Sequence, residues 1–305
     1  MSVQKWTAED IDTWLVEKRN WGRWGEDDQA GAVNLITPEK RLAALGLVRA
    51  GRTVSMARPI STSPQPGQRQ VVQQFGWRDT GNAFDHLQLP IHCLGSTHID
   101  ALNHNWDRDG VWNGRRVDEV FRANKASWAD VDVWHDGIIT RGVLLDVPKH
   151  RGTPSVTPDV PVTGAELEAI LAKTELTPEP GDALVINCGL EAWLEEKGQW
   201  GVWNADMTDF ARPGLDVSCL EFIREYDFAV VIADMHDASY PSYSEIAHTV
   251  HSMIWAYGVA LVDNAQVDRL AEVCVEVGSY EFLTLIAPLR IPGGTGSPVN
   301  PLAVF

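Results

Sequence analysis

The sequence predicts an α/β fold, because short apolar runs typical of strands alternate along the 305-residue chain with segments of helical periodicity. Three runs rich in Val, Ile and Leu suit buried strands, at residues 183–188, 228–233 and 282–287. Helices are expected between and beside these runs, at residues 163–173, 217–226, 246–257 and 265–273. Such alternation is typical of domains in which helices pack against a sheet.

A helical and loop extension is expected at about residues 1–50. Residues 7–10 look like a capped helix start and are followed by apolar residues at helical spacing. Thr37 and Pro38 open a second helix with a cap and a proline at its first position. The stretch between them, residues 21–34, is too rich in glycine and acidic residues for a helix or strand, so we expect an ordered loop.

Three other segments are expected to be irregular. Residues 61–70 and 148–161 are polar and contain proline, and we interpret them as loops because the elements beside them lack self-sufficient cores. Residues 1–305 are therefore expected to form a single domain. The glycine-rich run 293–296 has no helix signal after it, so we expect a tail loop there and no phosphate site.

Composition and charge exclude several classes of protein. The chain carries 25 Lys and Arg against 42 Asp and Glu, a net charge of −17 that disfavours nucleic-acid binding. No long apolar run predicts a membrane span, and the first residues lack the apolar stretch of a secretory signal, so we expect a cytoplasmic protein. The chain has no G-x-S-x-G motif, which is the main sequence sign of a serine hydrolase on an α/β scaffold. Four widely spaced cysteines are expected to be free and buried: Cys93, Cys188, Cys219 and Cys274.

Potential metal ligands and proton carriers crowd residues 90–114. The group is His92, His98, Asp100 and His104, which fall within thirteen residues. Side chains two apart on a strand project to the same face, so His98 and Asp100 are expected to present an imidazole and a carboxylate to one ion. The alternative is a strand and loop whose histidines form internal hydrogen bonds.

A second group of candidates lies nearer the C-terminus. His248 and His251 fall in a predicted helix, and Asp263 follows His251 by twelve residues. One continuous helix would separate His251 from Asp263 by about 18 Å. Gly258 is a suitable helix stop, however, and a strand at 259–262 that runs back beside the helix would return the two residues to one level. The alternative is a buried helix histidine and a strand-end aspartate, and His248 is interpreted as structural or solvent-facing.

Two further groups admit either a functional or a structural interpretation. Three polar residues follow the apolar run 228–233, at a strand end where α/β proteins often place functional groups: Asp234, His236 and Asp237. They are either pocket residues or an ordinary loop. Four tryptophans either line a flat apolar substrate pocket or pack in the core: Trp21, Trp24, Trp106 and Trp112.

These motifs resemble those of the metal-dependent cyclase-family hydrolases, which include bacterial kynurenine formamidases, isatin hydrolase and trans-dienelactone hydrolase. The family signature has the form H-x-G-T-H-x-D-x-P-x-H, and residues 97–100 with His104 match its second half. Leu102 replaces the proline, and Leu94 stands where the first histidine belongs.

A longer subgroup of the family matches the same region more fully. Its form is H-G-x-x-x-T-H-x-D-A-L-x-H followed by D-G-x-x-N-G, and His92 and residues 109–114 fit it, with Cys93 in place of the glycine. The resemblance extends to residues 20–25 and 141–146 and so covers most of the chain. The family's later motif, a histidine, a glycine seven residues on and an acid twelve residues on, falls on His251, Gly258 and Asp263, where Asp replaces Glu.

The resemblance implies one or two divalent ions, Zn or Mn, because the ligand set contains imidazoles and carboxylates but no thiolate. It assigns proton transfer to His104. By position, the implied ligands are His98, Asp100, His251 and Asp263, with His92 the least secure because its spacing from His98 is six residues rather than four.

The fold implied by the resemblance is a mixed central sheet, open or barrel-like, flanked by helices, in a homodimer or homotetramer. The implied activity is hydrolysis of an amide or a lactone or ester bond in a small cyclic or aryl-substituted molecule, with water activated by the metal. Two alternatives stay open. One is a catalytically silent or regulatory metal-binding protein of this fold, and the other is a lyase or cyclase on the same scaffold.

Overall fold

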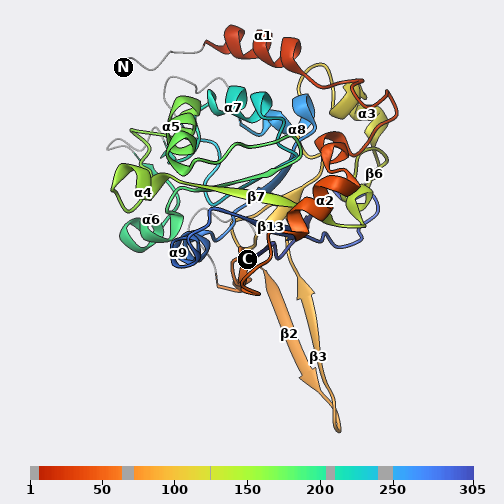
Figure 1. Ribbon diagram of the computed structural model, residues 1–305. Helices are drawn as coiled ribbons and strands as arrows, with labels where there is room; N and C mark the ends of the chain where they lie inside the picture. Colours follow the sequence, from red (N-terminus) through yellow and green to blue (C-terminus); the bar gives the residue numbers. More distant parts are fainter. Residues whose placement is uncertain (1–6, 64–71, 124, 204–209, 240–249) are drawn as a thin grey trace.

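A mixed sheet organises the computed structural model, which describes residues 7–63, 72–123, 125–203, 210–239 and 250–305 (Figure 1). Among these residues the sheet has nine strands in the order β1-β15-β13-β7-β8-β11-β12-β4-β14. The four strands from β7 to β12 are parallel, and the strands on either side of them pair antiparallel. The expected mixed sheet is confirmed in the form of a half-barrel with free edges at β1 and β14.

The strands of the sheet are short, and the central ones are buried. Their bounds are β1 Thr53–Ser55, β4 His98–Asp100, β7 Ile138–Asp146, β8 Ala183–Asn187, β11 Val230–Ala233, β12 Ala260–Asp263, β13 Glu281–Ile286, β14 Gly296–Pro298 and β15 Leu302–Val304. Every residue of β8 and β11 is buried, as expected for parallel strands covered on both faces. The three strands predicted from apolar runs are confirmed as β8, β11 and β13.

Helices flank this sheet, with α5, α7 and α8 above the long strand β7 and α6 and α9 below it in the view of Figure 1. The α-helices are α1 Ala8–Lys18, α2 Pro38–Leu45, α3 Val117–Val120, α4 Val147–Arg151, α5 Gly164–Thr174, α6 Leu190–Lys197, α7 Cys219–Glu225, α8 Ser252–Tyr257 and α9 Asp268–Val277. The 3-10 helices are η1 Gly31–Leu35, η2 Trp112–Gly114 and η3 Val131–Trp134.

The predicted helix starts depend on side-chain caps that the structure shows. Thr7 and Asp10 form a reciprocal capping box at α1. Thr37 accepts a hydrogen bond from the backbone N–H of Lys40 at α2, and Thr163 caps α5 in the same way. The helix predicted at 265–273 begins later, at Asp268. The helix predicted at 246–257 is present only as α8, which begins at Ser252, so that His251 is its N-cap and Val250 a turn residue, and residues 246–249 lie outside the described residues.

Three predicted loops contain regular structure. Residues 31–35 form η1, where Gly31 packs so closely on Gly258 that a Cβ would lie 2.3 Å from its carbonyl oxygen. The segment 148–161 begins inside α4, because the Asp146 carboxylate caps that helix through the backbone N–H of Lys149. The run 293–296 is not a tail loop, since Gly296 begins β14 and pairs with β4.

One large hydrophobic core joins the extension to the sheet, and α1 packs against α8. Ile11, Leu15 and Ile36 from the extension belong to this core. Cys188, Cys219 and Cys274 are free and buried, whereas Cys93 is half-buried. Within the described part of the chain, no helix is long and apolar enough to span a membrane.

A two-stranded hairpin projects from the body of the molecule (Figure 1). Its strands are β2 Gln73–Arg78 and β3 Ala83–Gln88, and every residue of both is exposed. Phe75, Trp77 and Phe84 lie on one face, because Phe75 pairs with His86 and Trp77 with Phe84. The remaining strand pairs are small: β5 Phe121–Arg122 with β6 Lys125–Ala126, and β9 Val202–Trp203 with β10 Phe210–Ala211.

Candidate metal centre

The candidate centre lies at the β14 end of the sheet, where β4 is held between β12 and β14. Antiparallel pairing sets Asp263 opposite His98, and Gly296 opposite Asp100. His98 and Asp100 are both buried, and they are two residues apart on β4, as the sequence predicts. The register of these three strands therefore brings both groups of candidate ligands to one place.

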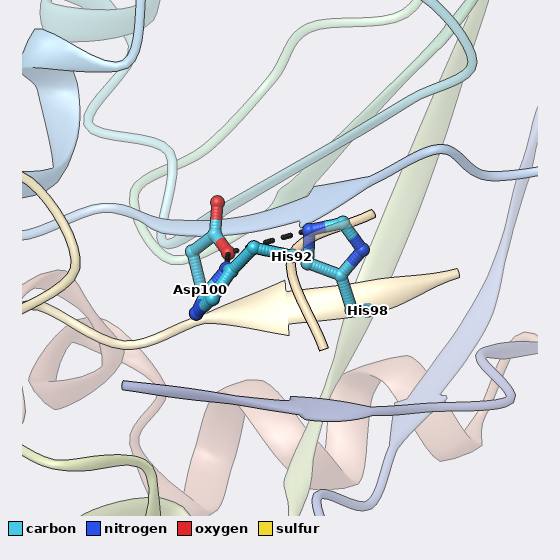
Figure 2. Close-up of side chains that lie close together, drawn as sticks. All are labelled: His92, His98 and Asp100. Carbon is cyan, nitrogen blue, oxygen red and sulfur yellow. Dashed lines mark hydrogen bonds and ion pairs between the residues drawn. The ribbon is translucent and has the colours of Figure 1, made fainter. Parts of the chain in front are cut away.

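Three side chains form the first half of the centre (Figure 2). Oδ1 of Asp100 lies 2.8 Å from Nδ1 of His92 and 3.6 Å from Nε2 of His98. The other ring nitrogen of His92 contacts the Thr295 hydroxyl at 2.8 Å. His92, the least secure ligand at the level of sequence, thus reaches the Asp100 carboxylate.

The second half gathers around the other oxygen of the same carboxylate. Oδ2 of Asp100 lies 3.9 Å from Nε2 of His104 and 3.8 Å from Nε2 of His251. Nε2 of His251 lies a further 3.9 Å from Oδ2 of Asp263. The predicted return of Asp263 to the level of His251 is confirmed, because Gly258 ends α8 in the left-handed region at φ 72° and β12 follows it.

The donor set fits a divalent cation. Two groups of potential ligand atoms each lie within 4.8 Å of one another: His92, His98 and Asp100, and Asp100, His104 and His251. Oδ2 of Asp100 is buried and has no hydrogen-bond partner among the described residues. A buried carboxylate oxygen without a donor is costly unless a cation neutralises it. Imidazole and carboxylate ligands without thiolate are a common donor set for divalent transition-metal ions.

Electrostatic coupling sets the protonation states at this centre. Burial alone would raise the pKa of Asp100, but His104 and the hydrogen bond from His92 outweigh it and hold that pKa well below its usual range. Burial lowers the pKa of His104 to about 4, although Asp100 opposes this shift. For His251, burial would lower the pKa, but Asp237 and then Asp263 and Asp100 raise it to about 9. Without a cation, His104 is therefore neutral and His251 charged at neutral pH.

The residues after β11 belong to the site region. The Asp237 carboxylate lies 2.7 Å from Nδ1 of His251, and Nε2 of His236 lies 3.2 Å from Oδ1 of Asp263. Asp234 accepts hydrogen bonds from two backbone N–H groups at the start of α6 and lines the cavity described below. Of the two interpretations of this segment, the structure favours pocket and site residues.

Two residues of the centre were missed at the sequence level. Thr295 contacts His92, and a Cβ at Gly296 would lie 2.8 Å from Cε1 of His92 and 2.6 Å from the carbonyl oxygen of Ile99. Only a glycine leaves room for the His92 ring there. The available signal was the glycine-rich run itself, which we interpreted as a tail. His248, the remaining histidine of the second group, lies outside the described residues.

A cavity of about 330 Å³ opens beside Asp263. Its polar lining includes Arg58 and Glu191, which form an ion pair, together with Asn264. Leu94, the residue at the family's first histidine position, also lines it. The remaining apolar wall comes from α6 and the residues after it, with Leu190, Leu194 and Trp200.

The four candidate tryptophans do not form the described wall of this cavity. Trp112 is fully buried and donates its indole N–H to the carbonyl oxygen of Asp28. Trp24 packs against Trp112, and Trp21 donates to the carbonyl oxygen of Trp255. Core packing is therefore the correct interpretation for these three, whereas Trp106 is 47% exposed.

Comparisons with known proteins agree with this architecture. A family model described as "Putative cyclase" matches residues 54–239. A crystal structure described as a novel cyclase is 30% identical over 95% of this chain and 99% of that chain, with a TM-score of 0.83. No protein with a curated description matches.

Two more distant structures share the fold. Isatin hydrolase A from Labrenzia aggregata, solved with benzyl benzoate bound, is 17% identical, with a TM-score of 0.60. Isatin hydrolase A from Ralstonia solanacearum is also 17% identical, with a TM-score of 0.57. Each comparison covers 88% of this chain and 98% of the other.

Proposed function

The chain belongs to the cyclase family, and on that premise we propose that it is a divalent-metal-dependent hydrolase of an amide or a lactone or ester bond. The observation that carries this proposal is the buried Asp100 carboxylate, which has four histidines around it and one oxygen without a hydrogen-bond donor. The names of the isatin hydrolases with this fold favour a small cyclic or aryl-substituted substrate.

In this proposal, one set of residues binds the metal ion and another residue transfers protons. His98, Asp100, His251 and Asp263, with His92, are the proposed ligands of one or two ions, Zn or Mn. A divalent ion held there would lower the pKa of bound water from about 16 toward about 7 and polarise a scissile carbonyl. His104, neutral at pH 7, is positioned to accept a proton from water and to pass it to the leaving group.

The cavity beside Asp263 supports a small substrate with an apolar ring. Its volume of about 330 Å³ lies at the lower end of the range for small-molecule sites. Leu190, Leu194 and Trp200 offer apolar surface, and Asp263 connects the cavity to the candidate ligands.

The test measures the metal content of the purified protein and then its hydrolysis of a panel of N-formylaryl amines, isatin-like lactams and lactones. Zn or Mn is expected in the protein, with hydrolysis of at least one panel class that a chelator abolishes and the metal restores. His104→Ala should abolish turnover. A protein that takes up no divalent metal, and that no metal activates, would refute the proposal.

Two features favour a second candidate, a catalytically silent or regulatory metal-binding protein. Leu94 lines the cavity at the position of the family's first histidine, and Asp263 is one methylene shorter than the family's glutamate. Bound metal without turnover of any panel member would select this candidate. Conversion of a panel member without addition of water would instead indicate a lyase or cyclase.

We also propose that the chain assembles as a homodimer or homotetramer in the cytoplasm, with a small molecule as its other partner. The β2–β3 hairpin supports assembly, because an isolated two-stranded hairpin with an exposed aromatic face is marginally stable in water. Three free, buried cysteines, Cys188, Cys219 and Cys274, support a reducing compartment. The net charge of −17 argues against nucleic acid as a partner.

A further inference from the structure

Asp237 holds His251 at both its ring and its backbone. Oδ2 of Asp237 lies 2.7 Å from Nδ1 of His251. Oδ1 of Asp237 accepts hydrogen bonds from the backbone N–H groups of Val250 at 2.9 Å and His251 at 3.3 Å. Asp237 is only 3% exposed, so water competes little for these bonds. The carboxylate therefore fixes the start of α8 and the orientation of the His251 ring together.

The neighbouring residue, His236, holds Asp263 in a comparable way. Nε2 of His236 lies 3.2 Å from Oδ1 of Asp263 and 3.3 Å from the carbonyl oxygen of Val262. Because both partners are acceptors, Nε2 carries the hydrogen. The backbone N–H of Asn264 donates to the same Oδ1 at 2.6 Å. With Oδ1 hydrogen-bonded to the Asn264 N–H and in contact with His236, Oδ2 of Asp263 is the oxygen that faces His251, at 3.9 Å.

These contacts decide which atoms face the centre. When Nδ1 of His251 donates to Asp237, the lone pair of the neutral ring is on Nε2, which points at Asp100 and Asp263. A ligand histidine whose other nitrogen donates to a carboxylate is held in the binding tautomer and is more basic. We propose that Asp237 and His236 are positioning residues of the metal centre, Asp237 for His251 and His236 for Asp263. This inference rests on the proposed function only in requiring that the centre binds a divalent ion.

The substitution Asp237→Asn tests the tautomer directly. The amide oxygen of the new asparagine must face the backbone N–H groups of Val250 and His251. Its NH₂ group then faces Nδ1 of His251. Nδ1 then becomes the acceptor and Nε2 carries the hydrogen, so the ring cannot bind an ion without rearrangement. For His236, the substitution to Gln keeps an N–H donor near the Nε2 position, whereas the substitution to Leu removes it.

The measurements are affinity for Zn²⁺ by chelator competition and the absorption spectrum of the Co²⁺-loaded protein. Asp237→Asn and His236→Leu are expected to bind Zn²⁺ roughly 10- to 100-fold more weakly, with altered Co²⁺ spectra. His236→Gln should recover most of the affinity. Asp216→Asn is the matched control, because the Asp216 carboxylate is also 3% exposed but accepts from the backbone N–H of Ser218.

Affinity and hydrolysis separate the two proposals. Loss of affinity in Asp237→Asn, with Asp216→Asn unchanged, supports the inference even if no panel substrate is hydrolysed. Wild-type affinity and spectra in both Asp237→Asn and His236→Leu would overturn it while leaving the proposed hydrolase intact. An equal loss in Asp216→Asn would also overturn it, since general destabilisation would then explain the effect. Wild-type protein that binds neither Zn²⁺ nor Co²⁺ would overturn both.

Discussion

Nδ1 of His92 lies 2.8 Å from Oδ1 of Asp100, although eight residues separate them and only Asp100 is on the strand. The contact exists because Thr295 holds the other nitrogen of His92 and Gly296 leaves space for the ring. Asp100 thus has one oxygen toward His92 and His98 and the other toward His104 and His251. It is the residue that both halves of the centre share.

The substitution Asp100→Asn is expected to abolish metal binding. It removes the negative charge from the one residue present in both groups of candidate ligand atoms, and an amide is a weak ligand for Zn or Mn. Metal content after dialysis measures the effect. The apoprotein should stay folded, because an asparagine amide has nearly the same shape as the carboxylate that it replaces. Retention of the full metal content would show that Asp100 is not a shared ligand.

The substitution His104→Asn is expected to keep the metal and to lose rate. Nε2 of His104 lies 3.9 Å from Oδ2 of Asp100, and its low pKa leaves the ring neutral at pH 7. Removal of a proton carrier costs roughly 10²- to 10⁴-fold in kcat. Metal analysis and kcat on the same preparation check both parts. If the metal is lost together with activity, His104 is a ligand instead.

The parts of this structure that could be predicted are governed by local signals. Buried apolar runs identified β8, β11 and β13, and a threonine before each of two helices, α1 and α2, identified its start. Gly258 and the apolar strand after it allow Asp263 to return beside His251 but do not require it, and the structure shows the return. Joining the two groups of candidate ligands into one centre required the family resemblance as well.

The parts that could not be predicted depend on contacts between distant segments. Thr295 reaches His92 across 203 residues, because β14 pairs with β4 in a register that neither segment encodes alone. Asp237 contacts His251 only after β11 and α8 are packed, so its sequence position gave no more than a strand-end hint. The short helix α4 depends on Asp146, a strand residue that caps it.

Metal binding at pH 7 is expected to release close to one proton per ion bound at His251. The pKa of His251 is raised to about 9 in the metal-free protein, so its ring is charged at pH 7, and a ligand nitrogen must lose its hydrogen. Affinity should rise about tenfold per pH unit up to about pH 9. His104, with a pKa of about 4, contributes no proton. Titration calorimetry in two buffers of different ionisation enthalpy measures the number of protons released. If no proton is released, His251 is not a ligand that is protonated before the metal binds.

The same two groups have opposite effects on the stability of the apoprotein. Because the pKa of His251 is raised from its ordinary value of 6.5, protonation of His251 stabilises the fold fully at a pH below 6.5. This contribution is lost as the pH rises through about 9. The lowered pKa of His104 stabilises the fold above 6.5, and this contribution is lost as the pH falls through about 4. The melting temperature of chelator-treated protein should therefore be highest between about pH 4 and about pH 9.

Replacement of the aromatic pair on the β2–β3 hairpin is expected to reduce the mass of the assembly in solution. Trp77 and Phe84 stack with ring centroids 5.4 Å apart and are 55% and 40% exposed, so their faces are available to a second copy of the chain. The double substitution Trp77→Ser and Phe84→Ser removes that surface, and light scattering after gel filtration measures the mass. Leu42→Ser on α2 is the matched control, because Leu42 is 69% exposed but lies away from the hairpin. Metal content should be unchanged in all variants, since neither hairpin residue contacts a candidate ligand in the described structure. A double variant with the mass of the wild-type assembly would show that the subunits associate through another surface.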